Sequence, residues 1–331
     1  MMFARERVKF LFGAIAMVFC LLSQARADAV LLLEEPYGRF GSFNPTGHAA
    51  VFLTNVCADS PTHLRPCEPG ESGVVISRYD RIAGYDWIAV PLIPYLYAVE
   101  RAEQIPAKVN ASAVAELRDR YRRAHLLELA PDAPDGRTPA GNWYELIGSA
   151  YDRGLFGFQV ETRPEQDAAL IAWLNGRRNH TRFELLWANC ADFAASVLNF
   201  YYPHAIHRNF FSDVGIMTPK QVARSLVRYS RRHSILEPSV FRIPQVAGSI
   251  GRSRSVDGLA EMVLKSKKYV VPLAVISPVV AGSIAAVYFA EGRFNPRHNV
   301  ASFDLLRLAQ PVPAASLKLK YGASDISSRS R

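Results

Sequence analysis

The chain has 331 residues, of which 49% are hydrophobic and 21% charged, and its formal net charge is +9. This length accommodates one large domain or two medium ones with a sizeable core, and the apolar content excludes an intrinsically disordered chain. The basic runs at residues 118–123 and 228–232 are typical of solvated helix faces, and no recognisable nucleic-acid-binding motif accompanies them. We therefore expect no nucleic-acid partner.

Residues 1–29 have the pattern of a secretory signal. Three basic residues precede an apolar run over residues 10–22, and small residues suited to cleavage follow at residues 25–29. The mature chain is then expected to begin near Asp28 or Val30, on the periplasmic or other extracytoplasmic face of the membrane. A signal that is retained as a membrane anchor is the alternative.

Export changes the net charge of the mature chain and the kind of partner that this charge favours. Removal of residues 1–27 leaves 35 basic and 29 acidic residues, a net charge of about +6. In an exported protein this charge favours anionic lipid or a cell-wall polymer as the partner.

The four cysteines have different expected fates. Cys20 lies in the signal and leaves with it, while Cys57 and Cys67 flank a short proline-containing loop and are natural disulfide partners in an oxidising compartment. Cys190 is then left over as a free thiol at the head of a helical pattern. Such a thiol is either buried and inert or chemically active, and a helix start favours the thiolate, which is the reactive form.

The order of expected elements predicts an α+β domain over residues 30–233. Short apolar runs separated by turn signals predict antiparallel strands in its first part, and apolar residues at helical spacing predict helices after them. Thr218 and Pro219 suit the N-cap and first position of the last helix. The predicted strands are residues 30–33, 48–53, 74–77 and 87–92, and the predicted helices are residues 111–129, 143–151, 165–175, 190–202 and 218–229.

The rest of the chain has a different pattern. Prolines and glycines interrupt any period in residues 234–268, which predicts a linker. Residues 269–290 contain no charge and, as one helix, would measure about 33 Å, enough to cross a bilayer core. We therefore expect a transmembrane helix there, followed by a basic tail over residues 291–331; a buried hairpin in a soluble domain is the alternative. Its direction stays open because basic residues crowd both ends.

The leftover cysteine suggests acyl transfer, which needs a thiolate, a base and donors for the oxyanion. Cys190 supplies the first, and the amides at the helix start supply part of the third. His48 is the candidate base, because it follows Gly47 and opens an apolar strand, so its ring would project from a rigid element. This chemistry requires no metal or cofactor. Metal binding by His204 and His207 is a minor alternative, and a structural role is expected for His63, His125, His180, His233 and His298.

The Gly-His pair at residues 47–48 and the Asn-Cys pair at residues 189–190, with Phe193 in the same helix, resemble a known family. The pattern is similar to the circularly permuted branch of the NlpC/P60 papain-like superfamily, as in the lecithin–retinol acyltransferase-like proteins. In organisation it most resembles exported domains of the Lnb N-terminal periplasmic (DUF4105) type. The resemblance covers approximately residues 30–230 and implies an antiparallel sheet packed against the cysteine helix.

The resemblance also implies roles for residues. Cys190 would be the nucleophile and His48 its base. Such sites usually have a third polar group on the strand after the histidine, for which Ser77 and Tyr79 are the candidates here. Asp192 is expected to point away from the cysteine and to favour the helix dipole.

These observations predict an exported, membrane-anchored, cysteine-dependent enzyme that uses a Cys–His dyad. It would be an amidase, peptidase, thioesterase or acyltransferase whose substrate is an envelope lipid, a lipoprotein or a peptidoglycan-derived molecule. The alternative is a catalytically inactive papain-like envelope protein that serves as a binding or scaffolding module.

Overall fold

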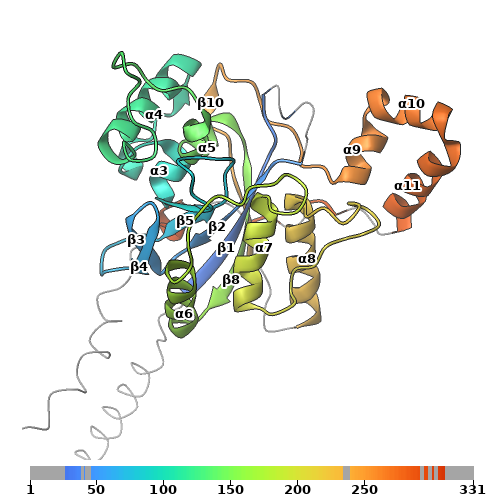
Figure 1. Ribbon diagram of the computed structural model, residues 1–331, viewed down its shortest axis with the longest axis horizontal. Helices are drawn as coiled ribbons and strands as arrows, with labels where there is room; N and C mark the ends of the chain where they lie inside the picture. Colours follow the sequence, from blue (N-terminus) through green and yellow to red (C-terminus); the bar gives the residue numbers. More distant parts are fainter. Residues whose placement is uncertain are drawn as a thin grey trace, which may run out of the picture.

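The computed structural model describes residues 27–38, 41, 46–233, 239–290, 294–296, 300–301 and 305–309. The first 26 residues of the predicted signal and most of the predicted tail lie outside the described residues. Within the described part, the centre of the molecule is a six-stranded sheet in the order β6-β5-β2-β1-β8-β9, antiparallel at every pairing (Figure 1). Its strands are β1 (Ala27–Glu34), β2 (His48–Leu53), β5 (Val74–Ser77), β6 (Ile88–Pro91), β8 (Leu155–Thr162) and β9 (Ser239–Ile243).

Helices cover both faces of this sheet. Successive side chains of a strand point to opposite faces, so Leu31 and Leu33 enter one core while Val30 and Leu32 enter the other. The first core contains α6 (Pro164–Asn175), α7 (Cys190–Tyr201) and α8 (Pro219–Arg232). The second contains α3 (Leu92–Tyr97), α4 (Ala111–His125), η2 (Asn142–Leu146) and α5 (Ser149–Asp152), and the short η1 (Ala102–Gln104) precedes α4. The predicted α+β class with an antiparallel sheet packed on helices is confirmed.

Two sheet strands, β8 and β9, were not predicted. Glycine in a strand interior is normally a breaker, and β8 carries Gly157 near its middle. A Cβ on Gly157 would lie 2.2 Å from a ring carbon of Phe241 in β9. The glycine therefore makes room for a side chain that lies far away in the sequence, and no local pattern could show this.

Between β2 and β5 the chain forms a small hairpin. β3 (Val56–Ser60) and β4 (His63–Pro66) pair with each other, and the predicted disulfide joins Cys57 to Cys67. The side chain of Asn175 in α6 accepts from the amide of Leu64 at 3.0 Å and donates to its carbonyl at 2.7 Å. These contacts fix the hairpin against the end of α6.

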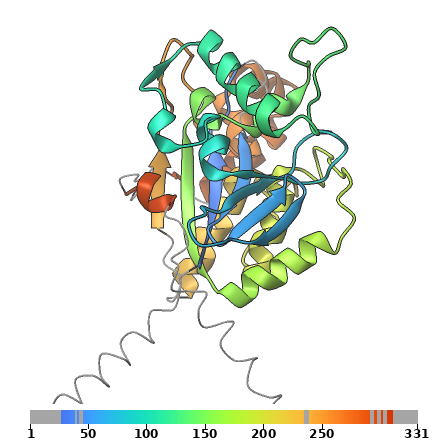
Figure 2. The same cartoon turned by 90° about the vertical axis from the view of Figure 1, so that its left-hand side faces the viewer.

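Residues 239–268, the described part of the segment predicted to be a linker, pack on the domain instead. They contain β9, then β10 (Ala247–Gly248), which pairs with β7 (Lys108–Val109), and α9 (Leu259–Lys265). Lys220 of α8 forms a buried ion pair with Glu261 of α9. Figure 2 shows the short α12 (Leu305–Leu308) beside β9, at the edge of the sheet.

Residues 269–290 are divided between two helices, α10 (Lys267–Ile276) and α11 (Pro278–Ala290), which project from the body with α9 (Figure 1). The break falls at Ser277, whose φ of −146° and ψ of 82° are not helical. Proline lacks an amide hydrogen and pushes the preceding residue out of the helical region, so Pro278 starts a new helix. Among the described helices, none combines the length and the apolar character needed to span a membrane.

Candidate active site

Asn189 fixes the start of α7, so that Cys190 is its first residue. The Asn189 side-chain oxygen accepts from the amides of Ala191 at 2.8 Å and Asp192 at 3.1 Å. In return, the Asp192 carboxylate accepts from the Asn189 amide at 3.1 Å, which completes a capping box. Asp192 thus serves the helix end, as predicted.

Cys190 is the free cysteine of the described residues and lies partly buried against β2. The ladder between β2 and β5 begins only at Val51 and Ile76, so the backbone of Ala49 is not paired with β5 there. The Ala49 backbone instead lies near the Cys190 thiol and acts to lower its pKa. The thiol therefore sits at the residue that directly follows His48.

His48 is held by the two residues predicted as third members of the site. Its Nε2 lies 2.9 Å from Ser77 Oγ, and its ring stacks on Tyr79 with centroids 5.2 Å apart. Ser77 also donates its hydroxyl hydrogen to the Ala49 carbonyl at 2.8 Å. Since a hydroxyl has one hydrogen, Ser77 Oγ accepts from His48, so Nε2 carries the ring hydrogen and Nδ1 is left with a lone pair.

Gly47 allows this arrangement. Its φ is +74°, and a Cβ at this position would lie 2.1 Å from the Glu34 carbonyl oxygen of β1. Only glycine tolerates both the backbone conformation and the close approach. The Gly-His pair therefore has a structural reason: the glycine brings the chain tightly into β2, and His48 is the first residue of that strand.

His48, Ser77 and Tyr79 meet where β2 begins and β5 ends, and Tyr79 belongs to the core on the α3–α5 side of the sheet, whereas Cys190 begins α7, which packs in the other core. Between Cys190 and His48, both of which are described, no hydrogen bond is formed; the backbone of Ala49 connects them. The dyad itself stays a prediction.

A buried polar network lies next to His48 and was not predicted. Glu34, which pairs with His48 across β1 and β2, is fully buried. Its carboxylate accepts from the Tyr95 hydroxyl, from Ser149 Oγ at 3.2 Å and from Arg153, whose Nη1 is also 3.2 Å away. The available signal was a pair of acids, Glu34 and Glu35, directly after an uninterrupted apolar strand.

Burial dominates the electrostatics of His48 and Cys190. Desolvation lowers the pKa of His48 to about 4; the Glu34 carboxylate opposes this and Arg153 adds to it. Desolvation also raises the pKa of the Cys190 thiol to about 11, although the backbone of Ala49 lowers it in part. The resting site therefore holds a neutral thiol and a neutral imidazole. Burial thus acts against the thiolate that the helix start is expected to favour, while the backbone contacts of Ala49 and Ala191 act for it.

The first amides of α7 are the candidate oxyanion donors. Those of Ala191 and Asp192 already donate to Asn189, and that of Phe193 donates to the Asn189 carbonyl at 3.1 Å. The amide of Cys190 has no hydrogen bond within the described residues. It is thus the helix-start donor that stays available to a ligand.

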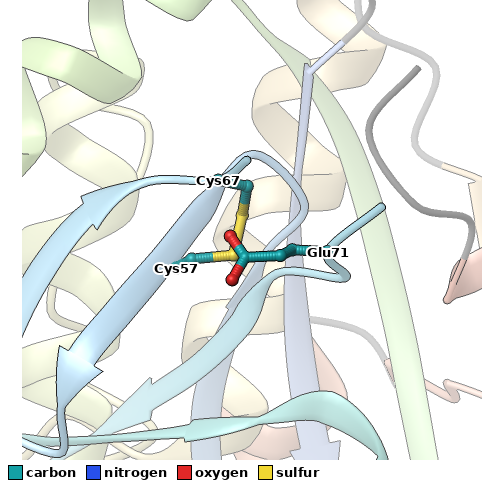
Figure 3. A group of neighbouring side chains, drawn as sticks. All are labelled: Cys57, Cys67 and Glu71. Carbon is teal, nitrogen blue, oxygen red and sulfur yellow. A yellow bond between two sulfur atoms is a disulfide. The ribbon is translucent and has the colours of Figure 1, made fainter. Parts of the chain in front are cut away.

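One group of potential metal ligands occurs in the described residues: Cys57, Cys67 and Glu71 (Figure 3). The two sulfurs are bonded to each other, so neither is a thiolate ligand. Arg65 binds both carboxylate oxygens of Glu71, at 2.6 Å each. In this oxidised form the group is a disulfide beside an ion pair.

Comparison of the chain with protein-family models, with curated proteins and with solved structures found no match.

Proposed function

We propose that this protein is an exported, membrane-anchored, cysteine-dependent acyl-transfer enzyme of the permuted papain-like type, acting on a cell-envelope substrate. The observation that carries the proposal is the joint placement of two side chains around Ala49. The Ala49 backbone lies near the Cys190 thiol, and the Ala49 carbonyl accepts from Ser77, whose hydroxyl oxygen lies 2.9 Å from His48 Nε2. His48 Nδ1 is then a base whose tautomer is already set.

Acylation follows from these groups. As Cys190 Sγ attacks the carbonyl carbon of the substrate, its proton passes to His48 Nδ1, and the carbonyl oxygen becomes an oxyanion. The free Cys190 amide donates to that oxyanion. When the tetrahedral intermediate collapses, the bond to the leaving group breaks, the leaving group takes the proton from Nδ1, and the acyl group remains on sulfur as a thioester.

Deacylation repeats these steps with a second nucleophile. Water or an acceptor hydroxyl or amine loses its proton to His48 Nδ1 and attacks the thioester carbon. The carbon–sulfur bond breaks, and the proton on Nδ1 returns to Sγ. Water as the acceptor gives a hydrolase, and another acceptor gives an acyltransferase.

The rival function is a papain-like binding or scaffolding module without catalysis. The observation that favours it is the neutral resting thiol, since burial raises the Cys190 pKa to about 11. Because thiolate is the reactive form, a site that never lowers this pKa would be inert.

The experiment compares acylation of the exported protein by an activated acyl ester, followed by intact mass, in the wild type and in Cys190→Ala and His48→Ala variants. We expect one acyl group per chain, lost in Cys190→Ala and formed roughly 10² to 10⁴ times more slowly in His48→Ala. Ser196→Ala, at an exposed position of the same helix, is the matched control and should leave the rate unchanged.

One result of these measurements would contradict the enzyme proposal. If Cys190 resists both the ester and a small alkylating reagent in the folded protein but reacts after unfolding, the buried thiol is structural and the binding-module function stands.

A further inference from the structure

Two exposed apolar loops flank the start of α7. The first is a tight turn closed by two hydrogen bonds between the backbones of Glu184 and Ala188, at 3.1 and 3.0 Å. The second connects α7 to α8. Their apolar residues, 44–77% exposed, are Leu185, Leu186, Trp187, Phe210, Phe211 and Val214; we call them the loop patch.

The two loops form one surface. A Cβ built on Gly215 would lie 3.0 Å from the Phe210 ring and 3.8 Å from the Trp187 ring. Arg208 donates to the carbonyls of Gly215 at 2.8 Å and Trp187 at 3.3 Å, and its guanidinium lies over the Trp187 ring. The aromatic side chains are therefore presented together although the backbone below them is firmly hydrogen-bonded.

This surface adjoins the candidate nucleophile. The side-chain amide of Asn189 donates to the carbonyls of Leu185 at 2.9 Å and Met217 at 3.0 Å, one in each loop segment. Arg208 also pairs with Asp192 in the first turn of α7. The residue before Cys190 thus joins both loops, and the loop patch borders the end of α7 at which the thiol lies.

The α10–α11 hairpin carries further exposed apolar side chains. Val275, Ile276 and Val279 are 78–82% exposed at its bend. The second loop reaches the hairpin's base, because the Ser212 carbonyl accepts from the Ala260 amide of α9 at 3.0 Å. Ser212 also lines a small cavity of about 40 Å³ together with Tyr288 of α11. Figure 1 shows the loop between α7 and α8 extending towards α11.

The charges around this surface are predominantly positive. The two loop segments, residues 176–188 and 203–217, and the hairpin, residues 267–290, contain two acids, Glu184 and Asp213. Their basic residues are Arg177, Arg178, Arg182, Arg208, Lys267 and Lys268, of which Arg208 is paired with Asp192 of α7. Exposed apolar side chains next to a basic excess fit the boundary of an anionic bilayer, where the apolar groups enter the acyl region and the cations meet headgroups.

We propose that the loop patch and the α10–α11 hairpin together dock this protein on an anionic lipid bilayer, with the Cys190 end of α7 facing the membrane. Exposed apolar surfaces of this kind are uncommon on proteins without a partner. A bilayer accepts separate protruding loops and a hairpin bend at once, because it needs no matching shape. If the proposed enzymatic function holds, on which this last step rests, the acyl donor is a bilayer-resident lipid or lipoprotein that enters between the two loops.

Trp187 reports directly on this docking, because the other tryptophans are more enclosed: Trp87 and Trp143 are buried and Trp173 is half-buried. The mature protein is mixed with vesicles of equal parts phosphatidylglycerol and phosphatidylcholine, with or without brominated acyl chains. We expect bromine to quench tryptophan emission in the wild type and to have little effect in a Trp187→Phe variant. Binding through another basic surface of the protein would leave Trp187 in water and unquenched.

Flotation with the same vesicles measures the contribution of the apolar groups. A Phe210→Ser/Phe211→Ser variant should partition at least about tenfold more weakly, because it removes two aromatic rings whose burial in the acyl region would favour binding. A Val275→Ser/Ile276→Ser variant should also bind more weakly. Leu127→Ser, at an exposed leucine after α4, is the matched control and should bind as the wild type does.

Three outcomes overturn the proposal: flotation without Trp187 quenching, binding that the Phe210/Phe211 change does not weaken, and a concentration-dependent dimer that covers the loop patch with no lipid binding. The Cys190→Ala variant separates the two proposals. If it still docks and the wild type shows no acylation, docking stands and the enzyme proposal fails.

Discussion

Strand β1 and the α10–α11 hairpin are built from similarly apolar sequence, yet they use it in opposite ways. Residues 29–33 in β1 are all fully buried, because β2 and β8 lie on both sides and helices cover both faces. In the hairpin, Val275, Ile276 and Val279 point mostly into solvent. The apolar residues of the sheet domain therefore stabilise its own fold, whereas those of the hairpin remain exposed and can contact a partner.

The body also buries charge, and the hairpin does not. Glu34 and Arg153 are both buried beside the His48 strand, and Tyr95 and Ser149 complete their hydrogen bonding. Such a pair is stable only while every member is present. The body should therefore be sensitive to single substitutions and to pH, and the hairpin insensitive to both.

The largest expected effect is the loss of the buried pair. Glu34→Ala removes the partner of Arg153 and leaves its charge buried, which should lower the free energy of unfolding by about 3–5 kcal/mol. Urea unfolding measures this. The surface pair of Glu116 and Arg120, both highly exposed, is the control: Glu116→Ala should cost less than about 1 kcal/mol. Equal effects of the two changes would show that the buried pair has no special role.

The second effect is a loss of stability at both ends of the pH range. Between about pH 6.5 and 4 the unfolded chain binds a proton at His48 that the folded protein does not, so stability falls as the pH falls. Between about pH 9 and 11 the unfolded Cys190 thiol ionises first, so stability falls as the pH rises. Each change is on the order of 3 kcal/mol.

Urea unfolding at a series of pH values tests these two changes. His48→Gln should remove the acid contribution and Cys190→Ala the alkaline one. If the loss of stability between about pH 6.5 and 4 persists unchanged in His48→Gln, a group other than His48 causes it.

The third effect concerns the helix that presents the cysteine. Asn189→Ala removes the N-cap of α7 and the hydrogen bonds to the two flanking loops, and should cost about 1–2 kcal/mol. Asn110, the N-cap of α4, offers a matched control with a comparable cap cost. Only the Asn189 change should also alter the alkylation rate of Cys190; an unchanged rate would mean that the cap does not position the thiol.

The smallest expected effect is in the hairpin. Ile276→Ser exposes no new core surface, so the free energy of unfolding should change by less than about 0.5 kcal/mol. Leu31→Ala in β1, at a fully buried position, should cost about 2–5 kcal/mol. A large cost for Ile276→Ser would place the hairpin bend in the folded core and would contradict the comparison.

The predicted elements that were confirmed depend on local signals. β2 and β5 match residues 48–53 and 74–77, and α8 begins at Pro219 with Thr218 as its cap. The Cys57–Cys67 disulfide followed from spacing and compartment. In each case the determining residues are neighbours in the sequence, so the pattern contained the information.

Local sequence signals also predicted that Cys190 starts a helix and that Ser77 or Tyr79 accompanies His48. Only the tertiary structure decided how they meet: strand register brings Ser77 to His48, and the interrupted ladder leaves the Ala49 backbone free for both Ser77 and Cys190. Burial, which no local pattern reports, then makes the thiol and the imidazole neutral. The exposure of the two loops was likewise set by which surfaces the fold left uncovered, whereas the division of the hairpin follows from Pro278, a local signal.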